Sequence, residues 1–294
     1  MGSPPCETLY TIPRHFPFSH IGSGVCFGSG VCFCPSGILQ CRRKHKNYMA
    51  SPTISSSRTA TPLWRPSWPA VSLKRRFRQR LLKWYESFGR DLPWRKTSDP
   101  YHILVSEVML QQTQVDRVIP KYHQFLDRYP SFERLASARM REVKKLWYPL
   151  GYNIRPERLH SIACETVQRY GGKLPNDHDQ LLSFKGIGRY TAGAIRSFAF
   201  NEDAPILDTN VSRVLYRVFI AKGDPKKNTV KLWQLAETLI PPGRGYDFNQ
   251  ALMDFGAICC TARAPSCQAC PMTPICKAYP FKVRGKSSWR KSSK

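Results

Sequence analysis

Apolar residues recur at helical spacing along most of the chain after residue 72. The stretch from Phe77 to Trp84 places its apolar positions on one face, and Gly89 ends this pattern. A second run, from Ile103 to Phe125, shows the same three-to-four spacing. Further helices are predicted over residues 131–147, 156–170, 178–183, 190–199, 210–220, 230–240 and 247–258. No set of alternating apolar and polar positions predicts strands, so we expect an all-α fold.

The first 72 residues lack this periodicity. They are rich in Ser, Pro, Gly and Arg, and we interpret residues 1–72 as a disordered or spurious N-terminal extension. An organelle leader and translation upstream of a true start at Met49 are both open explanations. We place the folded part at residues 73–280, followed by a basic tail at residues 281–294.

Two glycines form a tight turn between two of the predicted helices. Gly186 and Gly188 flank Ile187, which can pack into the core. Backbone amides at the start of the following helix suit a phosphate group. An ordinary helix–helix turn capped by glycine is the alternative. The continuation over residues 189–195, in a basic all-α chain, favours phosphate binding.

The charge balance points to a polyanionic partner. The chain has 46 Lys and Arg against 20 Asp and Glu, a formal net charge of +26. From residue 81 onward it still has 34 basic and 19 acidic residues, so the excess is not confined to the ends. Nucleic acid is therefore the leading candidate partner. No apolar run reaches the ~18 residues that span a bilayer, and we expect no membrane partner.

Four cysteines with six, two and five residues between them stand in one 17-residue segment: Cys260, Cys267, Cys270 and Cys276. Four thiolates at this spacing can surround one metal centre, either zinc or a [4Fe–4S] cube. The spacing alone does not separate these two metals. We interpret Cys259 as a core thiol, and Arg263, between the first two ligands, as a candidate phosphate contact.

Two carboxylates stand in unlike surroundings. Breaking an N-glycosidic bond requires protonation of the leaving base and a negative charge near the cationic sugar. Glu107 lies in an apolar stretch, where burial would raise its pKa and suit it to donate a proton. Asp208 precedes a predicted helix, and a simple N-cap role is its alternative. For Glu107 the alternative is an exposed position on an amphipathic helix.

Several strings of this sequence match one known family over residues 74–280. They are Leu92–Arg95, Val105–Val115, Gly186–Ile195, Leu207–Val211, Phe248–Ala257 and the four cysteines. In these strings the chain resembles the MutY-type A/G-specific adenine DNA glycosylases, which are relatives of the endonuclease III-like glycosylases.

This resemblance implies a two-lobed, helix-hairpin-helix glycosylase fold with a C-terminal four-cysteine iron-sulfur loop. A six-helix barrel lobe would cover about residues 98–205. A second lobe, from residues 73–97 and 206–280, would carry a [4Fe–4S] cluster on the four cysteines. The flipped base would lie between the lobes.

The resemblance also implies roles for individual residues. Glu107 would protonate adenine at N7, and Asp208 would stabilise or trap the oxocarbenium ion. Tyr190 and Asn210 would orient these groups. Because Tyr190 stands where bifunctional relatives have a Schiff-base lysine, we predict a monofunctional glycosylase. The DNA-binding residues would be Arg95 at the pocket, Gln111 and Gln112 in the DNA stack, Gly186, Gly188 and Arg189 at the hairpin, and Arg263.

The sequence departs from the family pattern in three places. It has Asp208-Thr209-Asn210 in place of Asp-Gly-Asn, and residues 149–153 differ from the usual Gly-Leu-Gly-Tyr-Tyr. Many members carry a C-terminal domain that reads 8-oxoguanine, whereas 18 residues follow Cys276 here. We therefore expect adenine excision opposite guanine or 8-oxoguanine, without assigning the preferred opposing base.

Two other functions stay open at this point. A thymine or uracil mismatch glycosylase would also have a tyrosine after the hairpin, although the string Gln111–Gln114 favours adenine. A non-catalytic binder of damaged DNA would not need both Glu107 and Asp208. In each case the expected partner is double-stranded DNA with a mispaired base. The chain is expected to act as a monomer, in the bacterial cytoplasm or in a eukaryotic nucleus or organelle.

Overall fold

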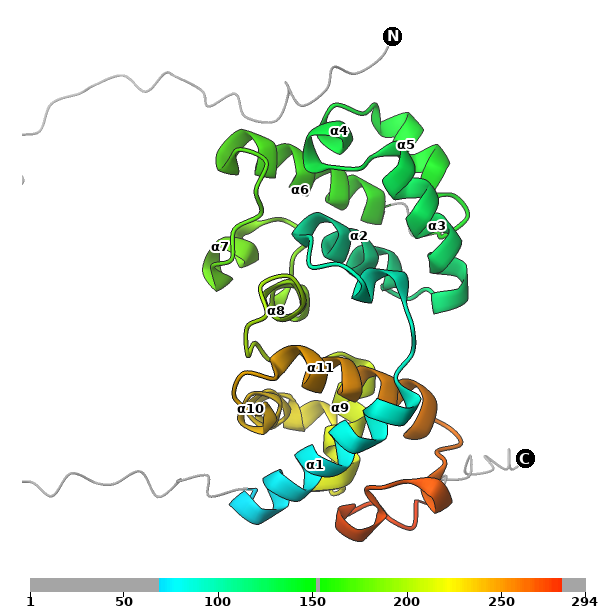
Figure 1. The fold of residues 1–294 in the computed structure, drawn as a ribbon, viewed down its shortest axis with the longest axis vertical. Coiled ribbons are helices and arrows are strands. Elements are labelled where there is room, and N and C mark those ends of the chain that lie inside the picture. Colours follow the sequence, from blue (N-terminus) through cyan, green and yellow to red (C-terminus); the bar gives the residue numbers. More distant parts are fainter. Residues whose placement is uncertain (1–68, 152–153, 282–294) are drawn as a thin grey trace, which may run out of the picture. The chain divides into compact units, whose positions relative to one another are not determined.

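Helices make up the regular secondary structure of residues 69–151 and 154–281, the part of the chain that the computed structural model describes (Figure 1). No strand occurs within these residues, which confirms the predicted all-α class. The proposed N-terminal extension lies outside them except for its last four residues, and so does the tail after residue 281. In the same part of the chain, no helix has both the length and the apolar character needed to cross a bilayer.

Eleven α-helices are described within these residues: α1 Val71–Phe88, α2 Pro100–Leu110, α3 Val115–Arg128, α4 Phe132–Ala136, α5 Met140–Trp147, α6 Ile154–Tyr170, α7 His178–Ser183, α8 Arg189–Phe198, α9 Thr209–Leu215, α10 Thr229–Leu239 and α11 Gly245–Asp254. Short 3₁₀ turns occur at Pro93–Arg95, Lys226–Asn228, Cys267–Ala269 and Thr273–Ile275. Two π-helical turns, Tyr216–Ile220 and Phe255–Cys259, extend α9 and α11.

The structure divides two of the segments that the periodicity predicts as continuous. The run from Ile103 to Phe125 is broken between Leu110 and Val115, where Gln112 has a left-handed φ of 56°. Residues 131–147 are also divided, between α4 and α5. A short interruption preserves the spacing of the apolar positions, so periodicity alone does not detect it.

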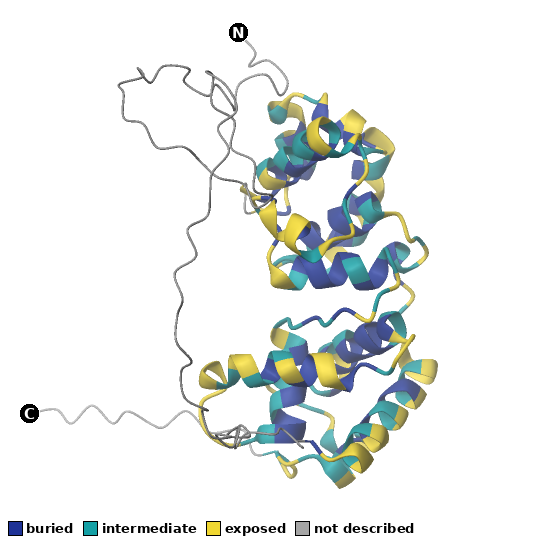
Figure 2. Cartoon of the chain, turned by 90° about the vertical axis from the view of Figure 1, so that its left-hand side faces the viewer, coloured by how far each residue is buried: buried dark blue, intermediate teal, exposed yellow. Residues whose placement is uncertain are grey.

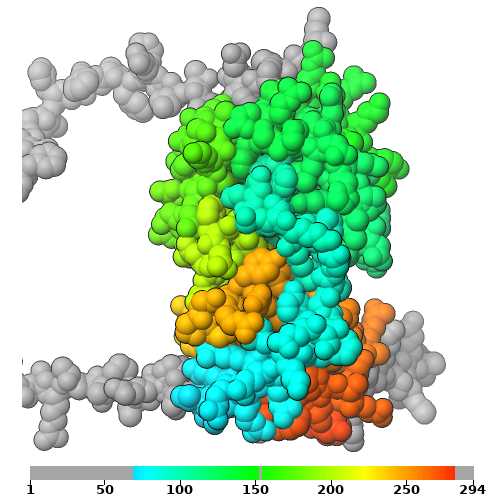
Figure 3. Space-filling view, viewed as in Figure 1, coloured from blue at the N-terminus to red at the C-terminus, as the bar shows by residue number. Residues whose placement is uncertain are grey.

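Helix α1 packs beside the chain's last described segment. Its buried face consists of Phe77, Leu81 and Leu82, and its outer face is exposed (Figure 2). Each of these buried side chains contributes about 1.5–3 kcal/mol by leaving water. Arg80 donates a 2.9 Å hydrogen bond to the carbonyl oxygen of Pro271. The start and the end of the described chain therefore lie side by side, as Figure 3 shows.

The buried apolar residues form two clusters that meet at α8. The first draws on residues between Leu92 and Ile195, and the second on α1, Ile103, Ala194 and residues 198–272. Helix α8 contributes to both clusters. The lobe boundaries predicted near residues 98 and 205 stay predictions. The arrangement brings α2, α8 and the start of α9 together around the site described next.

Candidate active site

Helix α2 buries a carboxyl group among apolar side chains. The helix begins at Pro100, where the Asp99 side chain caps it by accepting a 2.8 Å hydrogen bond from the Tyr101 amide. All residues from Ile103 to Met109 are buried, and Glu107 is only 5% exposed. The alternative that Glu107 lies on an exposed helix face is therefore wrong.

The surroundings of Glu107 hold its proton near neutral pH. The pKa of Glu107 is raised to about 7, chiefly by burial and to a smaller extent by the negative charge of the nearby Asp208. A hydrogen bond from Tyr190 and the positive charge of Arg95 act in the opposite direction. A carboxyl group with this pKa is partly protonated at neutral pH and can act as a general acid.

Tyr190 connects helix α8 to this carboxyl group. It lies in the first turn of α8, and its hydroxyl group is hydrogen-bonded to Glu107 and lies 3.9 Å from the sulfur of Met253. Burial, together with the negative charges of Glu107 and Asp208, raises the pKa of Tyr190 well above its ordinary value. The hydroxyl group therefore keeps its proton and donates it to the hydrogen bond with Glu107.

Asp208 forms the N-cap of helix α9. Its Oδ1 accepts a 2.6 Å hydrogen bond from the Val211 amide, and its Oδ2 accepts a 3.0 Å bond from Nδ2 of Asn210. Asp208 therefore does cap the helix, the role given above as its alternative, and its catalytic role stays a prediction. Burial raises the pKa of Asp208, whereas these two donors and Arg213 lower it. The charged carboxylate is supported by its donors.

Arg213 joins this capped carboxylate to the cysteine segment. Its Nη2 donates to Oδ1 of Asn210 at 2.8 Å and to the carbonyl oxygen of Gly256 at 2.7 Å, while its Nε donates to the carbonyl oxygen of Cys260 at 2.9 Å. With its oxygen held in this way, the Asn210 amide nitrogen points to Asp208. Gly256 allows the approach, because a Cβ there would lie 2.8 Å from that of Asn210. The sequence reasoning missed Arg213, although its spacing of three from Asn210 was a usable signal.

The side chain of Arg95 forms an ion pair inside the protein. Its two terminal nitrogens each donate 2.8 Å hydrogen bonds to the carboxylate of Asp254, and its side chain is 7% exposed. Arg90 binds the same carboxylate, which is fully buried. The positive charge of Arg95 also lies close enough to Glu107 to lower the pKa of that carboxyl group. Its role as a DNA contact stays a prediction, and Asp254 is a partner that the sequence reasoning did not identify.

The predicted hairpin joins α7 to α8. Gly186 has a φ of +115°, which favours glycine, and Ile187 is 5% exposed in the first apolar cluster. Gly188 differs, because its φ is −98° and a Cβ there would meet no atom within 4 Å. Nothing inside the described chain requires glycine at this position. No side chain caps the start of α8, where the exposed Arg189 stacks on the Trp233 ring at 4.0 Å.

The other predicted DNA contacts lie at the surface. Gln112 is exposed and Gln111 is half-buried, at the turn after α2. Arg263 is exposed in the segment between Cys260 and Cys267. Their contacts with DNA stay predictions.

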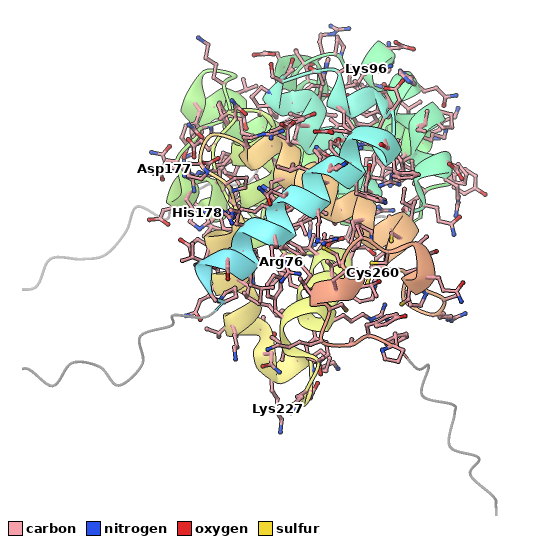
Figure 4. The ribbon with its side chains drawn as sticks, turned by 60° about the horizontal axis from the view of Figure 1, so that its bottom comes forward. Arg76, Lys96, Asp177, His178, Lys227 and Cys260 are labelled. Atoms are coloured by element: carbon pink, nitrogen blue, oxygen red, sulfur yellow. The ribbon has the colours of Figure 1, made fainter. Side chains whose placement is uncertain are left out.

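The four predicted cysteine ligands line one cavity, and none of them forms a disulfide. Cys260 lies where the chain leaves α11 and its π-helical turn (Figure 4). Arg217 contacts two of these cysteines: its Nη1 donates to Sγ of Cys260 at 3.5 Å, and its backbone carbonyl oxygen accepts from Sγ of Cys276 at the same distance. Among the described residues, no three His, Cys, Asp or Glu side chains converge closely enough to hold one metal ion.

The donor chemistry of this cavity fits a thiolate-bound cluster. A hydrogen bond from Cys259 and amide donors lower the pKa of Cys270, and the Met272 amide lies 3.4 Å from its sulfur. Arg217 places a positive charge beside Cys260. Amide donors and cations stabilise sulfur atoms that carry negative charge. Cys259 itself is 5% exposed in the second apolar cluster, as expected of a core thiol.

Comparisons with known proteins agree with this geometry. Residues 105–238 match the family described as HhH-GPD superfamily base excision DNA repair protein. The chain is 44% identical over 223 residues to the adenine DNA glycosylase of Mus musculus, and this match covers 72% of this chain and 43% of that protein. It is 38% identical over 216 residues to the thymine/uracil-DNA glycosylase of Pyrobaculum aerophilum, and this match covers 71% of this chain and 94% of that protein.

A solved structure of a thermostable thymine-DNA glycosylase is similar, with a TM-score of 0.67 and 36% identity, covering 71% of this chain and 97% of that one. The chain spans less than half the length of the mammalian relatives that it matches.

Proposed function

The chain belongs to the HhH-GPD superfamily of base excision DNA repair proteins, and from that premise we propose that it is a monofunctional DNA glycosylase that excises mispaired adenine. The base opposite the adenine would be guanine or 8-oxoguanine. The observation that carries this proposal is the buried Glu107, with a pKa of about 7, held beside Tyr190 and Asp208. The 44% identity to an adenine glycosylase supports the choice of base.

The proposed reaction divides the work between the two carboxyl groups. Protonated Glu107 gives its proton to N7 of the extruded adenine while the bond from N9 to the sugar C1′ breaks, and the electron pair leaves with the base. Asp208 stabilises the oxocarbenium ion or traps it covalently. Water then adds to C1′ and its proton passes to a carboxylate. Tyr190 and Asn210 orient the two groups through the hydrogen bonds described above.

Double-stranded DNA with a mispaired base is the proposed partner. Glycine at position 188 is required by neither backbone angle nor packing, whereas a closely approaching phosphate would require it. The uncapped amides at the start of α8 would then bind that phosphate. We expect the protein to act as a monomer in the compartment that holds the DNA.

A [4Fe–4S] cluster is the proposed cofactor of the four cysteines. When bound, such a cluster cross-links its four thiolates and so contributes to the stability of the segment that carries them. Cys260 would be one of these thiolates, and Arg217 would balance part of the negative charge. Purified protein should be brown, with absorbance near about 400 nm and iron in chemical analysis. A colourless protein loaded with zinc would contradict the cluster.

A thymine or uracil mismatch glycosylase is the second candidate function. It is favoured by the thymine/uracil-DNA glycosylase relative, of which the chain covers 94%, and by the similar thymine-DNA glycosylase structure. The string Gln111–Gln114 favours adenine, as stated above.

One experiment separates these functions. The protein is incubated with duplexes that contain A:8-oxoG, A:G, T:G or U:G, followed by alkali, with a fully paired A:T duplex as the control. We expect strand breaks at adenine only. Cleavage confined to the T:G and U:G duplexes would contradict adenine excision and support the thymine or uracil mismatch glycosylase. DNA binding without cleavage of any duplex would indicate a non-catalytic binder.

A further inference from the structure

A buried arginine from α6 holds the turn that follows α2. Arg155 lies in the first turn of α6 and is 3% exposed. Its Nη1 donates to three carbonyl oxygens: Val108 at 3.2 Å, Met109 at 2.8 Å and Gln111 at 2.5 Å. Arg155 thus contacts the final turn of α2 and the first residue beyond it.

The other terminal nitrogen extends this contact to a second loop. Nη2 of Arg155 donates to Oγ1 of Thr113 at 3.1 Å, and to the carbonyl oxygens of Leu150 at 2.9 Å and Gly151 at 3.2 Å. One guanidinium group therefore joins residues 111–113 to residues 150–151. The ammonium group of a lysine is a compact point charge without this planar fork, so it would not reproduce the set.

The turn has two properties that require such support. The last carbonyl groups of a helix lack partners within the helix, and a cation at this end is favourable. Gln112 adopts a φ of 56°, a left-handed conformation that is costly for a residue other than glycine and persists only where its surroundings impose it. Arg155 supplies both the partners for the carbonyl groups and the surroundings for the turn.

We infer that Arg155 is a positioning residue for base extrusion. It holds Gln111 and Gln112 in the shape in which they enter the DNA stack beside the extruded base. This inference rests on the proposed function. Arg155 itself is buried and contacts the turn, so its effect would pass through the turn.

A double-mutant cycle tests this role. We expect Arg155→Lys to slow single-turnover excision about 100-fold, the loss typical of a misplaced positioning element. A variant with Gln111→Ala and Gln112→Ala should be slowed to a similar extent. Adding Arg155→Lys to that variant should cost little more, because both changes remove the same turn. If the loss of rate in the combined variant equals the product of the two separate losses, the inference is overturned.

Two further measurements keep the test decisive. Arg169→Lys, an exposed arginine on the same helix, is the matched control and should excise at the rate of the wild type. If Arg155→Lys does not fold, Thr113→Val removes one of the acceptors and should slow excision about 10-fold. An unchanged rate for Thr113→Val would contradict the role.

A readout without chemistry separates this inference from the proposed function. The fluorescence of 2-aminopurine beside the mispaired base reports unstacking on protein binding. We expect an increase with the wild type and a much smaller one with Arg155→Lys at saturating protein. If the wild type excises no base, the proposed function fails. Equal fluorescence increases for the two proteins would refute the role of Arg155.

Discussion

The two ends of the candidate site place the same chemical group in opposite surroundings. At the α2 end, Glu107 is enclosed by apolar side chains and has the Tyr190 hydroxyl group as a partner. At the α9 end, Asp208 accepts from a backbone amide and from Asn210, with Arg213 behind them. Burial raises the pKa of both carboxyl groups, but only at Asp208 do several donors oppose it.

This difference supports the tasks proposed for the two groups. A carboxyl group that keeps its proton near neutral pH can protonate a leaving base, and one supported by donors can hold a negative charge beside a cationic sugar. Both groups lie within reach of each other's charge, so ionisation of one disfavours ionisation of the other. The predictions below change one end at a time.

The largest effect is expected at the α9 end. Asp208→Asn should reduce single-turnover excision about 1,000-fold, because it removes the charge that stabilises the cationic sugar. Asparagine caps helices as well as aspartate does, so the fold should be retained. The measurement pairs excision rates with gel-shift affinity for mispaired DNA. Retention of full activity would refute the role of Asp208.

A smaller effect is expected at the α2 end. Glu107→Gln should slow excision about 100-fold, the lower end of the usual contribution of a general acid. In the wild type the rate should fall as pH rises through about 7, because the protonated carboxyl group is the active form. The glutamine variant should show no such fall. A wild-type rate that rises over this range would contradict proton donation by Glu107.

The same pKa predicts a dependence of folding on pH. Because the pKa of Glu107 is higher in the folded protein than its ordinary 4.5, its contribution to stability is full below pH 4.5. That contribution is lost as pH rises through about 7. Denaturant unfolding gives the free energy of unfolding of the wild type and of Glu107→Gln at pH 5 and pH 8. Relative to the variant, the wild type should be less stable at pH 8 than at pH 5.

The α2 end was also the more predictable from sequence. The apolar neighbours of Glu107 already favoured its burial over the exposed position that was its alternative. Other contacts around the site join distant segments: Arg213, behind Asn210, reaches Cys260, 47 residues away, and Arg95 reaches Asp254, 159 residues away. Local periodicity carries no signal for such contacts. For the same reason, the left-handed turn at Gln112 and the guanidinium group that holds it were not foreseen.

An intermediate effect at the α9 end would show whether its donors matter. Arg213→Gln should slow excision about 10-fold, since Asn210 loses the donor that fixes its amide and Asp208 is then less well oriented. DNA affinity should change little. Lys227→Gln, an exposed change outside the site, is the control. An Arg213→Gln variant as fast as the wild type would mean that Asn210 is held without it.

The smallest effect is expected at Tyr190, which joins the two ends electrostatically. The hydrogen bond from Tyr190 lowers the pKa of Glu107, so Tyr190→Phe should raise that pKa. The fall in rate with pH should then move to higher pH, and the variant should keep a larger share of its maximal rate at pH 8. The maximal rate should fall by about 10-fold or less, because a hydrogen bond of this kind contributes modestly. Tyr216→Phe, whose hydroxyl group donates to Gly223, is the matched control and should leave the profile unchanged. A profile that moves to lower pH in Tyr190→Phe would contradict this prediction. It would mean that the Tyr190 hydroxyl group stabilises the protonated form of Glu107 and so raises the pKa of that carboxyl group.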